Sequence, residues 1–186
     1  MPFKFTPKEI PDVVKIISTT LEDERGFFEE LFKTSDFGDN RINYEFKQDN
    51  HSFSRKGVVR GLHFQHKPYE QGKLVFVIYG NIFDVAVDVR PLSDTFGKWV
   101  SEELSGENHK MLWIPKGFAH GFMALGDSHV IYKTTEEFAP DYEDGIIWND
   151  PDLSVKWPLL MPIVSQKDSR LKTFRDIKEL LKGDIS

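Results

Sequence analysis

Short runs of β-branched and aromatic residues, separated by turn residues, recur along most of the chain and constrain its fold. Gly, Pro, Asn and Asp fill the connections between the runs, and these residues favour tight turns. The runs predict strands over Val13–Ser18, Gly26–Phe32, Leu74–Tyr79, Ile82–Arg90, Lys98–Leu104, Lys110–Ile114 and His129–Thr135. Many short strands at this spacing indicate a mainly β protein, a sandwich or barrel of the jelly-roll type.

The two central runs carry the clearest local signals. Gly80-Asn81 lies between Leu74–Tyr79 and Ile82–Arg90, and a glycine followed by asparagine between two β-rich runs predicts a two-residue hairpin. Within Ile82–Arg90, three residues share one face of the strand and a phenylalanine and three valines share the other. This period of two predicts a half-buried strand.

Helices are expected to be few. One helical turn is predicted over 35–40, and only Leu171–Lys182 has a helical pattern of useful length, with Ser169 as its cap. Its apolar stripe consists of Phe174, Ile177 and Leu181. The chain has 186 residues and no recognisable linker, so residues 1–186 are expected to form a single domain, in which the Pro-rich stretch 151–162 is a wrapped loop.

Composition narrows the functional classes. The chain has no cysteine, which excludes disulfides, thiolate nucleophiles and cysteine-based zinc sites. A net charge of −6 without a basic block argues against a nucleic-acid partner. Because no apolar run is long enough to span a bilayer and the N-terminus does not resemble a signal peptide, we expect a cytoplasmic protein with no membrane partner.

The densest polar cluster is Arg60–Gln65. Strand alternation places His63 and Gln65 on one face. It would place Arg60 on the opposite face from His63, unless Gly61 bends the chain. A structural histidine and a catalytic one are both compatible with this pattern, although Arg60 before it and Lys73 in the next run favour a functional site.

A second cluster, Pro115–Phe122, contains a Pro-x-Gly-x-x-His turn that resembles the second short motif of the cupin superfamily, in which the histidine is often a metal ligand. The first cupin motif usually supplies His-x-His, and here Gln65 stands at the second histidine position. Glutamine is a poor ligand for a transition metal. A metal site therefore stays open only as an alternative, built from His63, His66, Glu70 and His120.

Other polar residues have equally good structural explanations when each is taken alone. Tyr132 and Thr134 share a strand face, where a buried tyrosine is usually part of the core. Lys167-Asp168 precedes the C-terminal helix and could be a helix-end charge pair. The polar sets Asp23–Phe28 and Gln48–Asn50 could be turns. Phosphate-loop, Rossmann, nucleophile-elbow and zinc-protease motifs are absent.

Taken together and in order, these segments resemble one family, the dTDP-4-dehydrorhamnose 3,5-epimerases. The sequences RGLHFQ, PKGFAHGF and WNDP, in register, make the most specific part of the likeness, which extends over nearly the whole chain. The resemblance implies a cupin-type jelly-roll fold, a dTDP-linked keto-sugar as substrate, no cofactor and no metal. It also implies a homodimer in which N-terminal strands are exchanged between subunits.

The resemblance further implies the roles of individual residues. The catalytic set comprises His63, Tyr132, Asp168 and Lys73. The substrate-binding set comprises Arg25, Glu30, Gln48, Asn50, Arg60, His120, Glu143 and Lys167. These residue types suit the implied reaction, because protons next to a ketone are acidic and imidazole can accept one near neutral pH. A lysine can stabilise the resulting enolate, and a tyrosine can return a proton from the opposite face.

Three alternatives remain beside the 3,5-epimerase. A relative on the same scaffold could invert only carbon 3 or only carbon 5 of a nucleotide-linked keto-sugar. A metal-dependent cupin enzyme would use the four ligands named above. A non-catalytic sugar-nucleotide-binding module would use the same polar residues without chemistry.

Overall fold

The computed structural model describes residues 3–183, and strands make up most of its regular structure. The strands are β1 (Lys4–Pro7), β2 (Val14–Ile17), β3 (Thr20–Asp23), β4 (Gly26–Glu29), β5 (Gln48–Ser54), β6 (Val58–Gln65), β7 (Lys73–Tyr79), β8 (Asn81–Asp88), β9 (Trp99–Ser105), β10 (Lys110–Ile114), β11 (Phe118–Ala124), β12 (Ser128–Thr134), β13 (Glu143–Gly145) and β14 (Ile163–Val164). The mainly β jelly-roll prediction is therefore confirmed.

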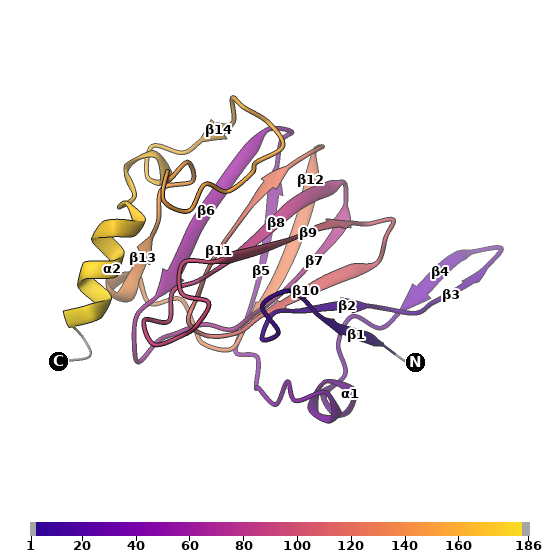
Figure 1. Cartoon of the computed structure of the whole chain (residues 1–186). Helices are drawn as coiled ribbons and strands as arrows, with labels where there is room; N and C mark the ends of the chain where they lie inside the picture. Colours follow the sequence, from indigo (N-terminus) through magenta and orange to yellow (C-terminus); the bar gives the residue numbers. More distant parts are fainter. Residues whose placement is uncertain (1–2, 184–186) are drawn as a thin grey trace.

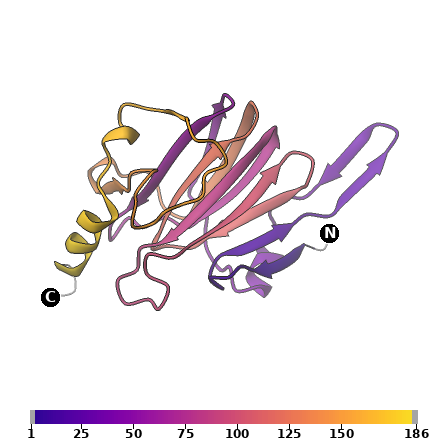
Figure 2. The same cartoon turned by 45° about the horizontal axis from the view of Figure 1, so that its top comes forward.

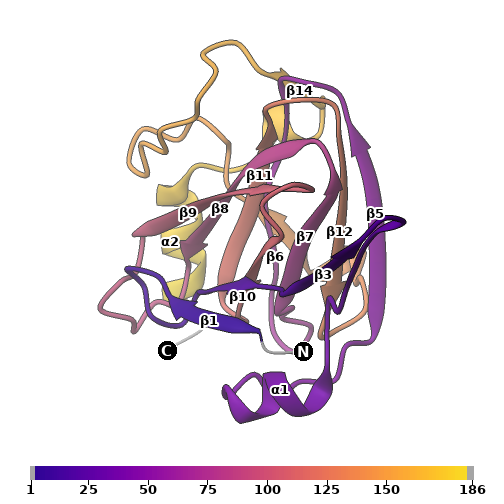
Figure 3. The same cartoon turned by 90° about the vertical axis from the view of Figure 1, so that its right-hand side faces the viewer.

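Two sheets face each other as layers (Figure 3). The first has the order β1-β2-β10-β7-β12-β5, and the second has the order β13-β6-β11-β8-β9. Neighbours along these orders are antiparallel, whereas β14 adds to β6 in parallel. A separate two-stranded hairpin, β3–β4, projects from the body of the protein (Figures 1 and 2). No helix among the described residues is long and apolar enough to cross a membrane.

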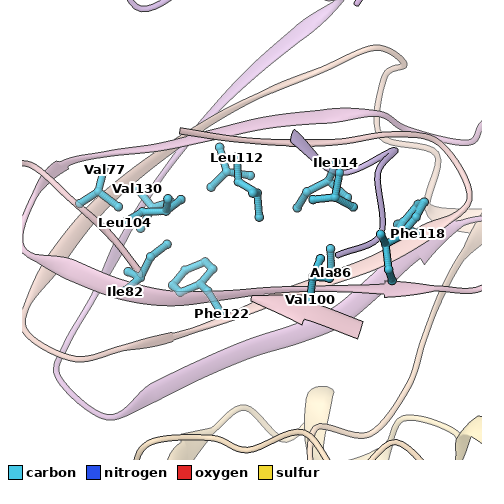
Figure 4. Packing of buried hydrophobic residues seen from close by; sticks show 13 residues of the cluster. Val77, Ile82, Ala86, Val100, Leu104, Leu112, Ile114, Phe118, Phe122 and Val130 are labelled. Carbon is cyan, nitrogen blue, oxygen red and sulfur yellow. The ribbon is translucent and has the colours of Figure 1, made fainter. Parts of the chain in front are cut away.

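The central apolar core fills the space between the sheets. Both sheets contribute side chains to it, for example Val77, Leu112 and Val130 from the first and Ile82 and Phe122 from the second (Figure 4). Most of these residues are almost fully buried. The core therefore closes one part of the interior and leaves polar side chains to line the rest.

The predicted hairpin at Gly80-Asn81 is wrong. Strands β7 and β8 belong to different sheets, so Gly80-Asn81 is a corner at which the chain crosses from one layer to the other. Gly80 has φ of +80°, and a Cβ there would lie 2.1 Å from the Asp127 carbonyl oxygen. The glycine was correctly identified as a turn residue, but turn chemistry does not specify which strands pair.

Strand β8 is buried on both faces, not half-buried as predicted. Ile82 and Ala86 join the core between the sheets, while Val85, Val87 and Val89 pack under the C-terminal part of the chain. The predicted alternation of the two faces is confirmed, but the C-terminal segment covers the face that would otherwise be exposed to solvent.

The helices are α1 (Thr34–Asp39) and α2 (Phe174–Gly183), with short 3₁₀ turns η1 (Pro140–Tyr142) and η2 (Asp168–Arg170). Helix α2 begins three residues later than predicted, and its cap is not Ser169. Thr173 and Asp176 form a capping box: Thr173 Oγ1 accepts the Asp176 N–H at 3.2 Å, and Asp176 Oδ2 accepts the Thr173 N–H at 3.0 Å. The predicted apolar stripe packs on the outer face of the second sheet.

Candidate functional site

A local irregularity in β6 positions the first two site residues. His63 pairs with His120 across to β11, but Arg60 pairs with Phe122, so β6 contains one extra residue between these pairs. A bulge of this kind shifts the alternation by one. Gly61 lies in it with φ of +112°, and a Cβ there would lie 2.6 Å from Gly121 Cα. The expected separation of Arg60 and His63 onto opposite faces is therefore wrong, because the bulge turns both toward one cavity.

Two adjoining cavities contain most of the predicted residues. The larger has a volume of about 530 Å³ and the smaller about 300 Å³, and His63, Lys73, Tyr132 and Glu143 line both. The larger is also lined by Arg60, His120, Lys167 and Asp168, and the smaller by Gln48 and Asn50. Ten of the twelve residues named from the sequence thus surround one continuous region, although they come from distant parts of the chain.

His63 and Asp168 form the first polar pair of the site. Asp168 Oδ1 lies 2.9 Å from His63 Nε2, and Asp168 Oδ2 accepts the Gly61 N–H at 3.3 Å. Burial alone would raise the pKa of Asp168, but the hydrogen bond and charge of His63 hold that pKa below its usual value. His63 Nδ1 has no hydrogen-bond partner within residues 3–183, so this nitrogen is free to accept a proton.

A second histidine–aspartate pair lies beside the first. His120 is the direct register partner of His63, and its Nε2 lies 2.7 Å from Asp84 Oδ1. Asp84 is fully buried, and its other oxygen has no hydrogen-bond partner in the described part of the chain. Strand alternation places Asp84 on one face of its strand, but nothing in the sequence predicted that it is a site residue.

Lys73 brings a buried positive charge to the wall of this region. Burial lowers the pKa of Lys73 to about 8, although the negative charges of Asp84 and Glu143 oppose the shift. No hydrogen bond of the Lys73 ammonium group is found within the described residues, so its donors are free for a ligand. A buried cation with free donors can stabilise a developing negative charge strongly.

Tyr132 faces the same region from β12 in the first sheet. Burial raises the pKa of its phenol, the positive charge of Arg60 opposes this and Glu143 adds to it, so the phenol stays protonated at neutral pH. At the mouth, Lys167 Nζ donates to Glu143 Oε2 at 2.6 Å. Arg60 donates to Ser54 Oγ at 2.9 Å. These charged groups surround an opening that is suited to an anionic ligand.

Phe138 was missed by the sequence analysis. It lines the smaller cavity with Gln48, Asn50 and Gln71, and about half of its side chain is exposed. A lone phenylalanine in an irregular segment carries no functional signal in the sequence, particularly in a chain with 16 of them.

Arg25 and Glu30 do not line either polar cavity of this chain. Arg25 lies at the turn of the β3–β4 hairpin, where its side chain is exposed and ion-paired with Asp23. Three apolar residues of the same hairpin, Leu21, Phe27 and Phe28, are each more than half exposed.

The four ligands named for a metal site are separated. His63 and His120 line the polar cavities, but His66 and Glu70 line a different cavity on the outer side of the second sheet. His66 Nε2 lies 3.1 Å from Asp144 Oδ2. Within residues 3–183, no three His, Cys, Asp or Glu side chains are arranged to hold a metal ion.

The outer cavity is larger than either polar cavity, at about 780 Å³, and lies between α2 and the segment after β8. None of the twelve residues named from the sequence lines it. The predicted catalytic and binding groups thus surround the cavities between the sheets, not the larger outer cavity.

Known proteins are similar to this chain over most of its length. A family model described as dTDP-4-dehydrorhamnose 3,5-epimerase matches residues 7–176. A dTDP-4-dehydrorhamnose 3,5-epimerase from Shigella flexneri is 49% identical over 170 residues, which cover 90% of this chain and 94% of the relative.

Two crystal structures are also similar. The dTDP-6-deoxy-D-glucose-3,5-epimerase from Legionella pneumophila, in complex with dTDP-4-keto-L-rhamnose, is 43% identical, with a TM-score of 0.93 and coverage of 97% of both chains. A 3′-monoepimerase from Streptomyces bikiniensis, in complex with dTDP-quinovose, is 28% identical, with a TM-score of 0.87 and coverage of 94% of this chain and 89% of that one.

Proposed function

The chain belongs to the dTDP-4-dehydrorhamnose 3,5-epimerase family, and from this we propose how its interior carries out the reaction. It is an isomerase of dTDP-rhamnose synthesis, and it inverts carbons 3 and 5 of dTDP-4-dehydro-6-deoxy-D-glucose to give dTDP-4-dehydro-L-rhamnose. Both carbons flank the 4-ketone, so each inversion requires removal of a proton and its return from the other face.

His63 is the base in this proposal. Its Nδ1 is free, and Asp168 fixes the ring through Nε2 and stabilises the imidazolium that forms when the ring takes a proton. The electrons of the broken C–H bond move into the ketone and give an enolate. The 2.9 Å contact between His63 and Asp168, inside the cavity that also contains Lys73 and Tyr132, is the observation that carries the proposal.

Lys73 and His120 stabilise the enolate oxygen. The Lys73 side chain is buried, and its ammonium has free donors that face the cavity. His120, held by Asp84, contacts the ligand next to it. Preorganised donors of this kind typically contribute the largest share of the rate enhancement.

Tyr132 returns the proton. It reaches the cavity from the first sheet, whereas His63 reaches it from the second. Base and acid thus approach the sugar from the two layers, as an inversion requires. The phenol remains protonated because burial raises the pKa of Tyr132. Arg60 and Lys167 neutralise the diphosphate, while Gln48, Asn50 and Glu143 contact the remaining parts of the substrate.

Incubation with the dTDP keto-sugar in heavy water tests the function directly. The proposed reaction incorporates solvent deuterium at carbons 3 and 5, visible by NMR, and retains full activity in a chelator. Absence of exchange would indicate a binding module, and loss of turnover on metal removal would indicate a metal-dependent cupin enzyme.

A single-carbon epimerase is the second candidate, because the Streptomyces bikiniensis monoepimerase shares the fold over most of its length. The same experiment separates the two functions. Exchange and inversion at both carbons support the 3,5-epimerase, and inversion confined to one carbon supports the alternative.

The protruding hairpin supports a homodimer, which we propose acts in the cytoplasm. Solvent exposure of Phe27 and Phe28 is unfavourable in a lone subunit, and Arg25 lies outside the cavities of its own chain. We expect the exchanged hairpin to bring Arg25 and Glu30 to the substrate of the partner subunit.

Co-expression of two variants tests this arrangement. A dimer of Arg25→Ala with His63→Ala has one site with both residues intact if Arg25 acts in the partner, so it should regain activity that neither parent has. If Arg25 acted in its own subunit, the mixture would show no gain.

A further inference from the structure

Residues 136–139 lie in the irregular segment between β12 and η1, and side-chain hydrogen bonds hold them in place. The segment belongs to no helix or strand, so no ladder satisfies its backbone groups. Glutamine side chains take that place. The chain has four glutamines, and three of them hydrogen-bond to this one segment.

Gln65 makes the central contacts. Its Nε2 donates to the Glu137 carbonyl at 3.2 Å and to the Tyr69 carbonyl at 2.6 Å, and its Oε1 accepts the Ala139 N–H at 2.8 Å. The side chain is 5% exposed, so these bonds are made away from water. Gln65 therefore ties the segment after β6 to the segment after β12.

Gln48 and Gln71 complete the support from either side. Gln48 Oε1 accepts the Phe138 N–H at 2.8 Å, and Gln71 Nε2 donates to the Glu136 carbonyl at 2.8 Å. Three glutamine side chains thus bind four consecutive residues of the segment, and Thr134 Oγ1 also donates to the Glu136 carbonyl, at 2.8 Å. The result is one wall of the smaller cavity, where Phe138 faces the same space as Lys73 and Tyr132.

We propose that Gln65 and Gln71 are positioning residues that fix residues 136–139 and thereby set how tightly the smaller cavity holds the substrate. This deepens, and rests on, the proposed epimerase function, because the smaller cavity adjoins the larger one and His63 lines both. Neither glutamine takes part in proton transfer. The position occupied by a metal ligand in many cupins serves here to order a binding wall.

Loss of the glutamine hydrogen bonds should change KM and kcat in a specific way. Without the amide bonds the segment samples other conformations, and apparent affinity falls by the fraction of molecules that keep the competent one. If that fraction is about one tenth, KM rises about tenfold. At saturation the substrate selects the same bound conformation, so kcat stays nearly constant.

The test compares Gln65→Met and Gln71→Met with wild type, using Gln166→Met as the matched control. Gln166 is the fourth glutamine; it is exposed and lines neither polar cavity. The measurements are KM and kcat with the keto-sugar, Kd for dTDP by calorimetry, and hydrogen exchange of the amides of Phe138 and Ala139. We expect KM to rise about tenfold for Gln65→Met and less for Gln71→Met, with kcat within about twofold. Amide exchange should be faster in both variants, and the control should match wild type.

Three outcomes would overturn the inference: an unchanged KM in both variants, a fall in kcat at constant KM, or unchanged amide exchange. Should Gln65→Met fail to fold, Gln71→Met, which removes a single hydrogen bond, decides the question. A wild-type enzyme that binds dTDP but does not epimerise would instead refute the proposed function. In that case the Kd for dTDP and the amide exchange of the variants still decide the inference.

Discussion

Four strands, β7, β8, β11 and β12, contribute to both the apolar and the polar part of the interior. Strand β7 contributes Lys73 and then Val75, and β12 contributes Val130 and then Tyr132. Strands β8 and β11 alternate in the same way and place Asp84 and His120 among apolar neighbours. Sheet geometry therefore fixes the spacing of inward side chains but not their chemistry.

The difference has an energetic meaning. The apolar part supplies burial, which stabilises the fold. Within residues 3–183, the polar part has a fully buried Asp84 oxygen without a hydrogen-bond partner and a Lys73 ammonium without a hydrogen bond, both of which cost stability. Substitutions in the polar part should therefore reduce catalysis far more than stability, and substitutions in the apolar part should do the reverse.

The strongest challenge to this division is His63→Ala. Loss of the base should lower kcat by about 10⁴-fold, the upper end for general base catalysis, while the thermal midpoint changes little. Steady-state kinetics and calorimetry on one preparation measure both. A kcat within tenfold of wild type would contradict the role of His63.

Lys73→Met should lower kcat by about 10²–10³-fold, because the enolate loses its buried cation. The free energy of unfolding should change little, since the desolvation cost of the ammonium is removed together with its interactions. Denaturant titration measures this. A large loss of stability with retained turnover would show that Lys73 has a structural role and not a catalytic one.

Leu112→Ala tests the apolar part of the interior. Leu112 is fully buried in the apolar core, and its truncation should cost about 2–5 kcal/mol of unfolding free energy. Below the new thermal midpoint, kcat should stay close to wild type, because Leu112 lines neither polar cavity. Loss of kcat in folded protein would show that the two parts are coupled.

A smaller effect is expected from pH. Lys73 acts as the ammonium, so kcat/KM should fall as pH rises through about 8. Asp84 and Glu143 are the charges that raise the pKa of Lys73 against the effect of burial. Asp84→Asn removes one of them, lowers that pKa further and should move the alkaline limb to lower pH. The exposed Asp94→Asn is the matched control, and an identical profile in both variants would refute the link.

The sequence predicted seven of the fourteen strands found among the described residues, the C-terminal apolar stripe and ten of the residues around the cavities, because periodicity and motifs are local signals. It failed where the answer depended on distant partners. The hairpin at Gly80 became a corner between sheets, and the bulge at Gly61 brought Arg60 to the side of His63. The roles of Asp84 and Phe138 and the contacts of Gln65 were not predicted, because they too depend on residues distant in the sequence.

The measurement that tests the central claim most directly is deuterium exchange in heavy water for Tyr132→Phe and His63→Ala. If His63 forms the enolate and Tyr132 only returns the proton, His63→Ala should lose exchange at both carbons. Tyr132→Phe should still exchange, because His63 can reprotonate the enolate from its own face, but with reduced inversion. Near-wild-type exchange in His63→Ala, or complete loss of exchange in Tyr132→Phe, would contradict the account.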